Sequence, residues 1–188
     1  MRTRRDFSCV LSISILLALS IANSAMAQVP TPAEVIGFQP GADHHLADYD
    51  QIQSYFHALD EASGRVILEQ IGTTTLGKPM LLAFISSEDN LRNRERYREI
   101  NRRLALAEGL TDEQARRLAD EGRTTVWIDG GLHATELAPS MHTPLLAHWL
   151  ATDESEEARS IRDNVILLLM PNMNPDGLDI VTNWYRSN

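Results

Sequence analysis

Cysteine is almost absent from the sequence: Cys9 is the only one among 188 residues, and aromatic residues make up only 6% of the chain. One thiol cannot form an internal disulfide, and it cannot supply the cysteine sets that hold structural zinc. Basic residues are also scarce, with 17 lysines and arginines against 26 aspartates and glutamates and a net charge of −9. An acidic chain disfavours nucleic acid and anionic membranes as partners. These shortages exclude cysteine-based zinc fingers and basic nucleic-acid-binding proteins.

Residues 1–27 have the pattern of a secretory signal peptide. Three arginines occur among the first five residues, residues 7–22 are mainly apolar, and Ala25-Met-Ala27 is typical of a cleavage site. The apolar run is short for a membrane span and ends in small residues. We therefore expect export to the periplasm or the cell exterior by the Sec or twin-arginine route, with no stable membrane association after cleavage. Cys9 leaves with this segment, which excludes a cysteine protease.

Strands and helices alternate along the rest of the chain, and this order predicts an α/β fold with a mixed sheet flanked by helices. We expect residues 28–47, which contain proline and glycine, to form a partly extended lead-in to the alternating strands and helices of residues 48–188. From periodicity and turn residues we expect helices at about 48–63, 91–108, 111–121, 138–151 and 154–162, and strands at about 66–71, 80–87, 124–128 and 164–170. Thr111 and Gln114 have the spacing of a capping box.

A candidate metal site follows the expected strand at 124–128. The run Thr124-Thr-Val-Trp-Ile128 has the composition of a buried strand, and Asp129-Gly-Gly-Leu-His-Ala-Thr-Glu136 comes directly after it. The two glycines allow a sharp turn because glycine tolerates backbone angles that other residues avoid. From such a turn the His133 imidazole and the Glu136 carboxylate can converge on one cation. Ligands of open α/β sheets bind just past the carboxyl ends of the strands.

The His-x-x-acid spacing alone is weak support. With 6 histidines and 26 acidic residues in the chain, roughly one such match is expected by chance. The matches are His45 with Asp48, His57 with Asp60, and His133 with Glu136. The first pair lies in a polar loop, and the second fits the polar face of an amphipathic helix. Only the third pair follows a strand and a tight turn.

A second strand is expected to end near the first. Asn164-Val-Ile-Leu-Leu-Leu-Met170 is a continuous apolar run, which is typical of a strand buried on both faces. It leads into Pro171-Asn-Met-Asn-Pro-Asp-Gly177, which is dense in turn-forming residues. We interpret Asn174, Asp176 and Gly177 as structural residues of this turn and not as catalytic groups.

Gly-x-His-x-x-Glu after one strand, followed about forty residues later by Asn-Pro-Asp-Gly after another, resembles the zinc carboxypeptidases of the M14 family. The likeness covers most of the chain after residue 33 and is closer to a bacterial secreted branch than to the digestive enzymes. The phrases that carry it are Gly37–Asp43, Leu76–Met80, Ile85–Ser87, Trp127–Gly131 and Asn183–Arg186. The resemblance implies that residues 48–188 are the N-terminal portion of a zinc-carboxypeptidase-like catalytic domain, incomplete at its C-terminus.

The resemblance also implies a function: an exported, Zn²⁺-dependent metallocarboxypeptidase that hydrolyses the C-terminal bond of a peptide or protein with a zinc-activated water. His133 and Glu136 match the first two zinc ligands. The family's third ligand and its catalytic glutamate come later than residue 188, so this chain alone is expected to be inactive. Arg186, after Trp184, matches an arginine that polarises the scissile carbonyl, and a surface arginine is the alternative.

Several alternatives stay open. An aspartoacylase-like deacylase of small N-acyl amino acids usually has glycine after the ligand histidine, where this chain has Ala134. Digestive carboxypeptidases have arginine where this chain has Thr135, which leaves open how extended substrates are held. Trimming of peptidoglycan peptides is compatible with export. A non-catalytic binding module or truncated product is the alternative outside enzymes. His142 and His148 are interpreted as structural, with His148 packed or half exposed.

Overall fold

The centre of the fold is a four-stranded mixed sheet with the strand order β1-β2-β4-β3. A computed structural model describes residues 28–188, and the expected signal peptide at 1–27 lies outside the described residues. The strands are β1 (Val66–Thr73), β2 (Pro79–Ile85), β3 (Thr124–Asp129) and β4 (Val165–Met170). β1 pairs with β2 and β2 with β4 in antiparallel fashion, whereas β3 and β4 are parallel. The carboxyl ends of β3 and β4 therefore lie next to each other.

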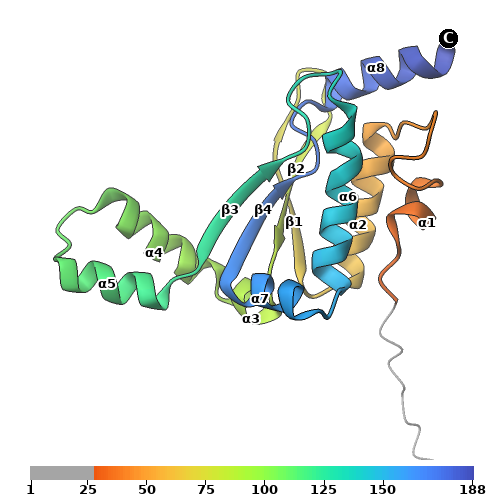
Figure 1. The fold of residues 1–188 in the computed structure, drawn as a ribbon. Coiled ribbons are helices and arrows are strands. Elements are labelled where there is room, and N and C mark those ends of the chain that lie inside the picture. Colours follow the sequence, from red (N-terminus) through yellow and green to blue (C-terminus); the bar gives the residue numbers. More distant parts are fainter. Residues whose placement is uncertain (1–27) are drawn as a thin grey trace, which may run out of the picture.

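Eight helices accompany the sheet within residues 28–188. They are α1 (Pro32–Ile36), α2 (Tyr49–Ala62), α3 (Glu88–Arg92), α4 (Arg94–Leu106), α5 (Asp112–Glu121), α6 (Leu137–Thr152), α7 (Glu156–Asn164) and α8 (Pro175–Ser187). α2 and α6 cover one face of the sheet, and α4 and α5 form a hairpin that projects away from it (Figure 1). None of the helices in the described part of the chain combines the length and hydrophobicity required to cross a membrane.

The core lies between the sheet and the two helices α2 and α6. Apolar residues at helical spacing give α2 one buried face, which includes Tyr55 and Phe56. Side chains alternate across a strand, so Ile85 of β2 and Leu167 and Leu169 of β4 point to the same face and pack against these helices. This packing holds β4, and through it the loop that follows β4, in one position.

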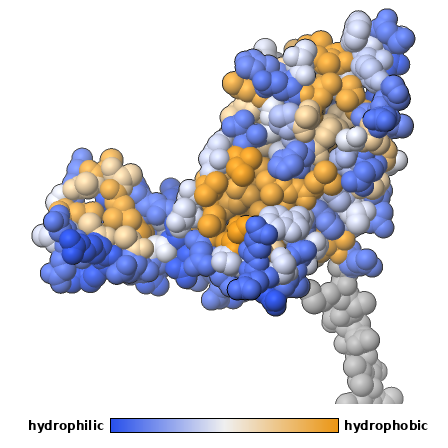
Figure 2. Space-filling view, viewed as in Figure 1, coloured by the Kyte–Doolittle hydropathy of each residue, from blue (hydrophilic) through white to orange (hydrophobic). Residues whose placement is uncertain are grey.

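The prediction that β3 is a buried strand is wrong. β3 pairs only with β4 and forms an edge of the sheet within residues 28–188, and Val126 and Trp127 are 37% and 46% exposed. A β-branched composition shows that a segment prefers the extended conformation, but it does not report what covers the strand. Figure 2 shows apolar side chains at the surface over the strands and along the inner side of the α4–α5 hairpin.

The other face of the sheet is only partly covered. Phe84, Ile166 and Leu168 line a cavity of about 400 Å³ whose wall is formed by Arg94 and Arg98 of α4. The Arg94 guanidinium lies 5.9 Å from the centre of the Phe84 ring, within the range of a cation–π contact. The long arginine side chains of α4 therefore line the cavity over the apolar residues of β2 and β4.

Most helix boundaries agree with those predicted from the sequence, and the differences have local causes. Asp48 caps α2, and Thr111 forms the expected capping box with Gln114. The single helix expected at 91–108 is two helices, α3 and α4, because the backbone leaves the helical conformation at Asn93. α1 and α8 are absent from the prediction; α1 has a complete capping box, formed by Thr31 and Glu34.

Candidate metal centre

The loop of residues 130–136, here called the metal loop, turns sharply at two buried glycines. A Cβ atom at Gly130 would lie 2.3 Å from the Pro171 carbonyl oxygen, so no other residue fits this position without movement of the backbone. Gly131 has φ of +82°, in the left-handed region that favours glycine. The Gly130 N–H donates to the Met170 carbonyl at 3.0 Å and extends the pairing of β3 with β4. The glycine pair therefore keeps the metal loop close to the end of β4.

His133 and Glu136 face each other at the tip of the metal loop. His133 Nδ1 lies 2.9 Å from Glu136 Oε1, and the His133 backbone N–H donates to Oε2 at 2.9 Å. The two side chains are 72% and 46% exposed, so an ion can reach both of them. Hydrogen bonds from the His133 side chain and backbone hold the pKa of the Glu136 carboxyl below its ordinary value. The carboxylate is therefore ionised at neutral pH, which is the form that binds metals.

The geometry of this pair fits zinc. Nitrogen and oxygen ligands bind zinc at about 2.0–2.1 Å, so two ligands of a tetrahedral ion lie roughly 3.3 Å apart. The 2.9 Å between His133 Nδ1 and Glu136 Oε1 requires only a small separation to admit the ion. Within residues 28–188, no three His, Cys, Asp or Glu side chains gather into a metal-binding group. The described part of the chain thus brings together two side chains of the types that bind zinc.

The loop after β4 and the start of α8 pack against the metal loop. Asn174 caps α8 by accepting a hydrogen bond from the Gly177 N–H at 3.0 Å. A Cβ atom at Gly177 would lie 2.8 Å from the Cβ atom of Ala134, so α8 begins directly against the metal loop. Asp176 accepts hydrogen bonds from Thr74 Oγ1 at 2.7 Å and from the Leu76 N–H at 3.1 Å. These contacts agree with the interpretation of Asn174, Asp176 and Gly177 as structural residues.

Arg186, the residue matched to a carbonyl-polarising arginine, lies near the end of α8. Its guanidinium donates to Asp48 Oδ2 at 2.6 Å, to the Leu46 carbonyl at 2.7 Å and to Gln51 Oε1 at 2.6 Å. None of the hydrogen bonds found for Arg186 in the described structure reaches the metal loop. A guanidinium that binds a substrate carbonyl must first release such charge-assisted bonds. The contacts favour a role in joining α8 to the start of α2, and the catalytic role stays a prediction.

The other histidines lie apart from the His133–Glu136 pair. His57 is exposed on α2, as expected for the polar face of a helix, and His45 Nδ1 lies 2.8 Å from the Asp43 carbonyl in the lead-in. On α6, His142 is exposed and His148 is half-buried, which confirms the expectation for His148. Burial lowers the pKa of His148.

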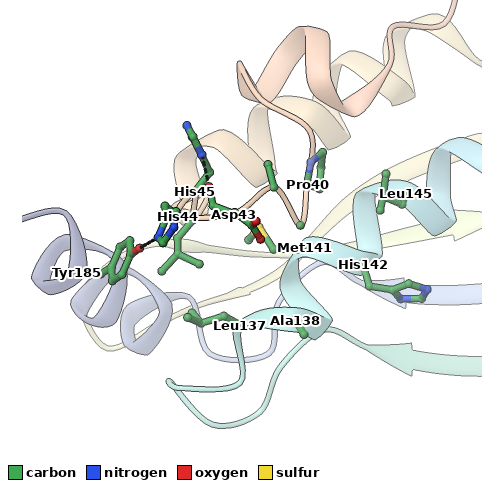
Figure 3. Close-up of a pocket in the computed structure, with 13 residues that line it drawn as sticks. Pro40, Asp43, His44, His45, Leu137, Ala138, Met141, His142, Leu145 and Tyr185 are labelled. Carbon is green, nitrogen blue, oxygen red and sulfur yellow. Dashed lines mark hydrogen bonds between the residues drawn. The ribbon is translucent and has the colours of Figure 1, made fainter.

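A cavity of about 510 Å³ adjoins the metal loop, and sequence reasoning did not find it. Its walls come from residues 40–46 of the lead-in, the first turns of α6 and Tyr185 of α8, and they include Leu137, the residue after Glu136. Figure 3 shows His44 and Tyr185 facing each other, with 3.5 Å between His44 Nδ1 and the Tyr185 hydroxyl oxygen, and His142 pointing away from them. The lining combines apolar residues such as Leu137 and Met141 with a few polar ones such as His44 and Tyr185, which is the usual composition of a ligand-binding cavity.

The chain is similar to one protein family and to several solved structures. The family model described as zinc carboxypeptidase matches residues 52–188, more than half of the chain. Among solved structures, thrombin activatable fibrinolysis inhibitor is 13% identical with a TM-score of 0.53, over 83% of this chain and 33% of that one. Carboxypeptidase A from Helicoverpa armigera is 14% identical with a TM-score of 0.52, over 80% of this chain and 32% of that one.

At these identities the likeness to the two solved structures shows the fold: a mixed sheet flanked by helices. The chain spans about a third of the length of either structure. No curated protein matches the chain.

Proposed function

Because this chain belongs to the zinc carboxypeptidase family, we propose that it carries part of the zinc site of a metallocarboxypeptidase, a hydrolase that removes residues from the C-terminus of a peptide or protein. The observation that carries the proposal is the His133–Glu136 pair, with 2.9 Å between Nδ1 and Oε1 at the carboxyl end of β3. An imidazole and an ionised carboxylate are two of the ligands that catalytic zinc sites use.

The ion supplies Lewis acidity and an activated water when bound. His133 and Glu136 would hold it, and the glycine pair at 130 and 131 keeps the metal loop tight against the end of β4. Catalytic zinc has three protein ligands and a general base within reach of its water. We infer that the third ligand and the base come from outside residues 28–188, which is consistent with a match that covers only 33% of thrombin activatable fibrinolysis inhibitor. Residues 28–188 alone are then inactive.

We infer further that the protein is exported and acts in the periplasm or outside the cell. The support is the residue pattern of 1–27, with its arginines, apolar run and Ala25-Met-Ala27. The net charge of −9 disfavours nucleic acid as a partner. The phrases Gly37–Asp43 and Asn183–Arg186 support placement in a bacterial secreted branch of the family.

Zinc retention by single-site variants tests the metal site. His133→Ala and Glu136→Ala should each lose bound Zn²⁺ on dialysis, measured by atomic absorption, because each removes one of the two ligands that residues 28–188 provide. His57→Ala is the matched control: it has the same His-x-x-acid spacing, but its imidazole is exposed on α2. Equal zinc content in the parent protein and the two ligand variants would refute the assignment. Equal loss in the His57 variant would show that binding is not specific to the metal loop.

A further inference from the structure

A series of buried hydrogen bonds, here called the buried network, lies next to the metal loop. The Asn174 N–H donates to Asn172 Oδ1 at 2.7 Å, and Asn172 Nδ2 donates to Ser140 Oγ at 2.6 Å. Ser140 Oγ in turn donates to the Gly130 carbonyl at 3.4 Å. Ser140 is 0% exposed and Asn172 is 3% exposed. The buried network connects the loop after β4, the first turn of α6 and the metal loop.

The direction of these bonds is determined by the chemistry of the groups. A hydroxyl has one proton to donate. Ser140 donates it to the Gly130 carbonyl, and its oxygen accepts a hydrogen bond from the Asn172 amide. The Asn172 amide is oriented by the Asn174 N–H, which can only donate to its oxygen. The donors therefore run in one order, from Asn174 to Gly130.

The buried network also contacts the backbone of the metal loop at Gly131. A Cβ atom at Gly131 would lie 3.0 Å from Ser140 Oγ and 3.3 Å from Asn172 Nδ2, so the backbone two residues before His133 rests on both side chains. A buried polar group lowers the stability of the fold unless it has a hydrogen-bond partner. An apolar side chain of similar size would fill the same space without needing a partner. Fully paired networks of this kind specify one arrangement of the backbone.

We propose that Ser140 and Asn172 are positioning residues that hold the metal loop in the conformation in which His133 and Glu136 converge. They touch neither ligand side chain; they act through the Gly130 carbonyl and the Gly131 backbone. This inference rests on the proposed function, because the ligand whose binding they support is the zinc ion at His133 and Glu136.

The first test is the affinity of the full chain for Zn²⁺ alone, measured by titration calorimetry. Ser140→Ala should weaken Zn²⁺ binding about tenfold, the lower end of the range for residues that orient metal ligands. The control is Thr143→Val, which removes another buried hydroxyl of α6, one that donates to the Pro171 carbonyl at 2.8 Å but not to the metal loop. The control should lower the melting temperature to a similar degree and leave the zinc affinity unchanged.

Asn172→Asp is the second variant, for the case in which Ser140→Ala does not fold. It keeps the shape and the acceptor for the Asn174 N–H, but the new carboxylate accepts from Ser140 and leaves the Gly130 carbonyl without its donor. Zinc affinity should fall here as well. Parent affinity in both Ser140→Ala and Asn172→Asp, alongside zinc loss in His133→Ala, would overturn the positioning role alone. Unchanged zinc binding in His133→Ala would instead overturn the proposed function.

Discussion

Tyr49 and Asp179 lie 130 positions apart in the chain, and the Tyr49 backbone N–H donates a 2.8 Å hydrogen bond to Asp179 Oδ1. Lys78 Nζ lies 2.5 Å from the other oxygen of the same carboxylate and 3.3 Å from Asp50 Oδ1. One side chain of α8 therefore joins the start of α2 to the turn between β1 and β2. Because α8 also begins against Ala134, these bonds help to hold the helix that supports the metal loop.

Asp179→Ala should destabilise the protein more than Asp50→Ala, although both carboxylates pair with Lys78. The Asp179 side chain is 16% exposed, and its loss leaves a buried backbone N–H unpaired, which costs about 1–3 kcal/mol. The Asp50 side chain is 72% exposed, and a surface ion pair contributes about 0–1 kcal/mol. Urea unfolding of the two variants measures the difference. Equal losses would show that the Tyr49 hydrogen bond contributes nothing.

Gly130→Ala should disrupt the metal loop. Its new methyl group would meet the Pro171 carbonyl oxygen at 2.3 Å and Thr143 Cγ2 at 2.7 Å, and overpacking of this kind costs about 1–3 kcal/mol. Gly72→Ala is the control, since its methyl group would meet only Met80, at 3.9 Å and beyond. Thermal unfolding should show a lower midpoint for Gly130→Ala and little change for Gly72→Ala. A parent-like midpoint for both would mean that the backbone beside Pro171 moves freely.

The half-buried His148 should make stability depend on pH. Burial lowers its pKa in the folded protein below the ordinary 6.5, with a smaller opposing effect from Glu34. The unfolded chain therefore binds the proton more readily, so this contribution to stability is present above pH 6.5 and is lost as the pH falls below it. We expect His148→Gln to flatten the fall in the free energy of unfolding between pH 6.5 and about 5. His142→Gln, on the same helix, is the comparison; equal flattening in both would exclude burial as the cause.

Arg162 should be the arginine whose loss costs most among those of α7. Its side chain is 4% exposed, and Nη1 donates to the Leu150 carbonyl at 2.8 Å and the Asp153 carbonyl at 2.6 Å. Arg162→Met leaves these carbonyl acceptors unpaired, and a buried acceptor without its donor costs about 1–3 kcal/mol. Arg159→Met, exposed on the same helix, should change stability by at most about 0.5 kcal/mol. Similar unfolding free energies for the two variants would contradict this assignment.

The elements with local signals could be predicted from the sequence. Asp48 and Thr111 begin helices because a short side chain that accepts from a nearby N–H is a property of four consecutive residues. β4 could be predicted because a continuous apolar run between turn residues is itself local. α8 could not be predicted in the same way: the residues from Pro171 to Gly177 favour turns, and the same composition also begins a helix when asparagine caps it and proline follows.

The sequence by itself determined that His133 and Glu136 face each other, because a strand end, two glycines and a spacing of three residues are all local features. Only the tertiary structure decided what surrounds them. Ser140 and Asn172 are 32 positions apart, and Arg186 and Asp48 are 138 apart. Contacts over such separations depend on how the sheet and helices pack, since no local propensity relates the two residues. For the same reason the exposure of β3 follows from its place at the sheet edge and not from its composition.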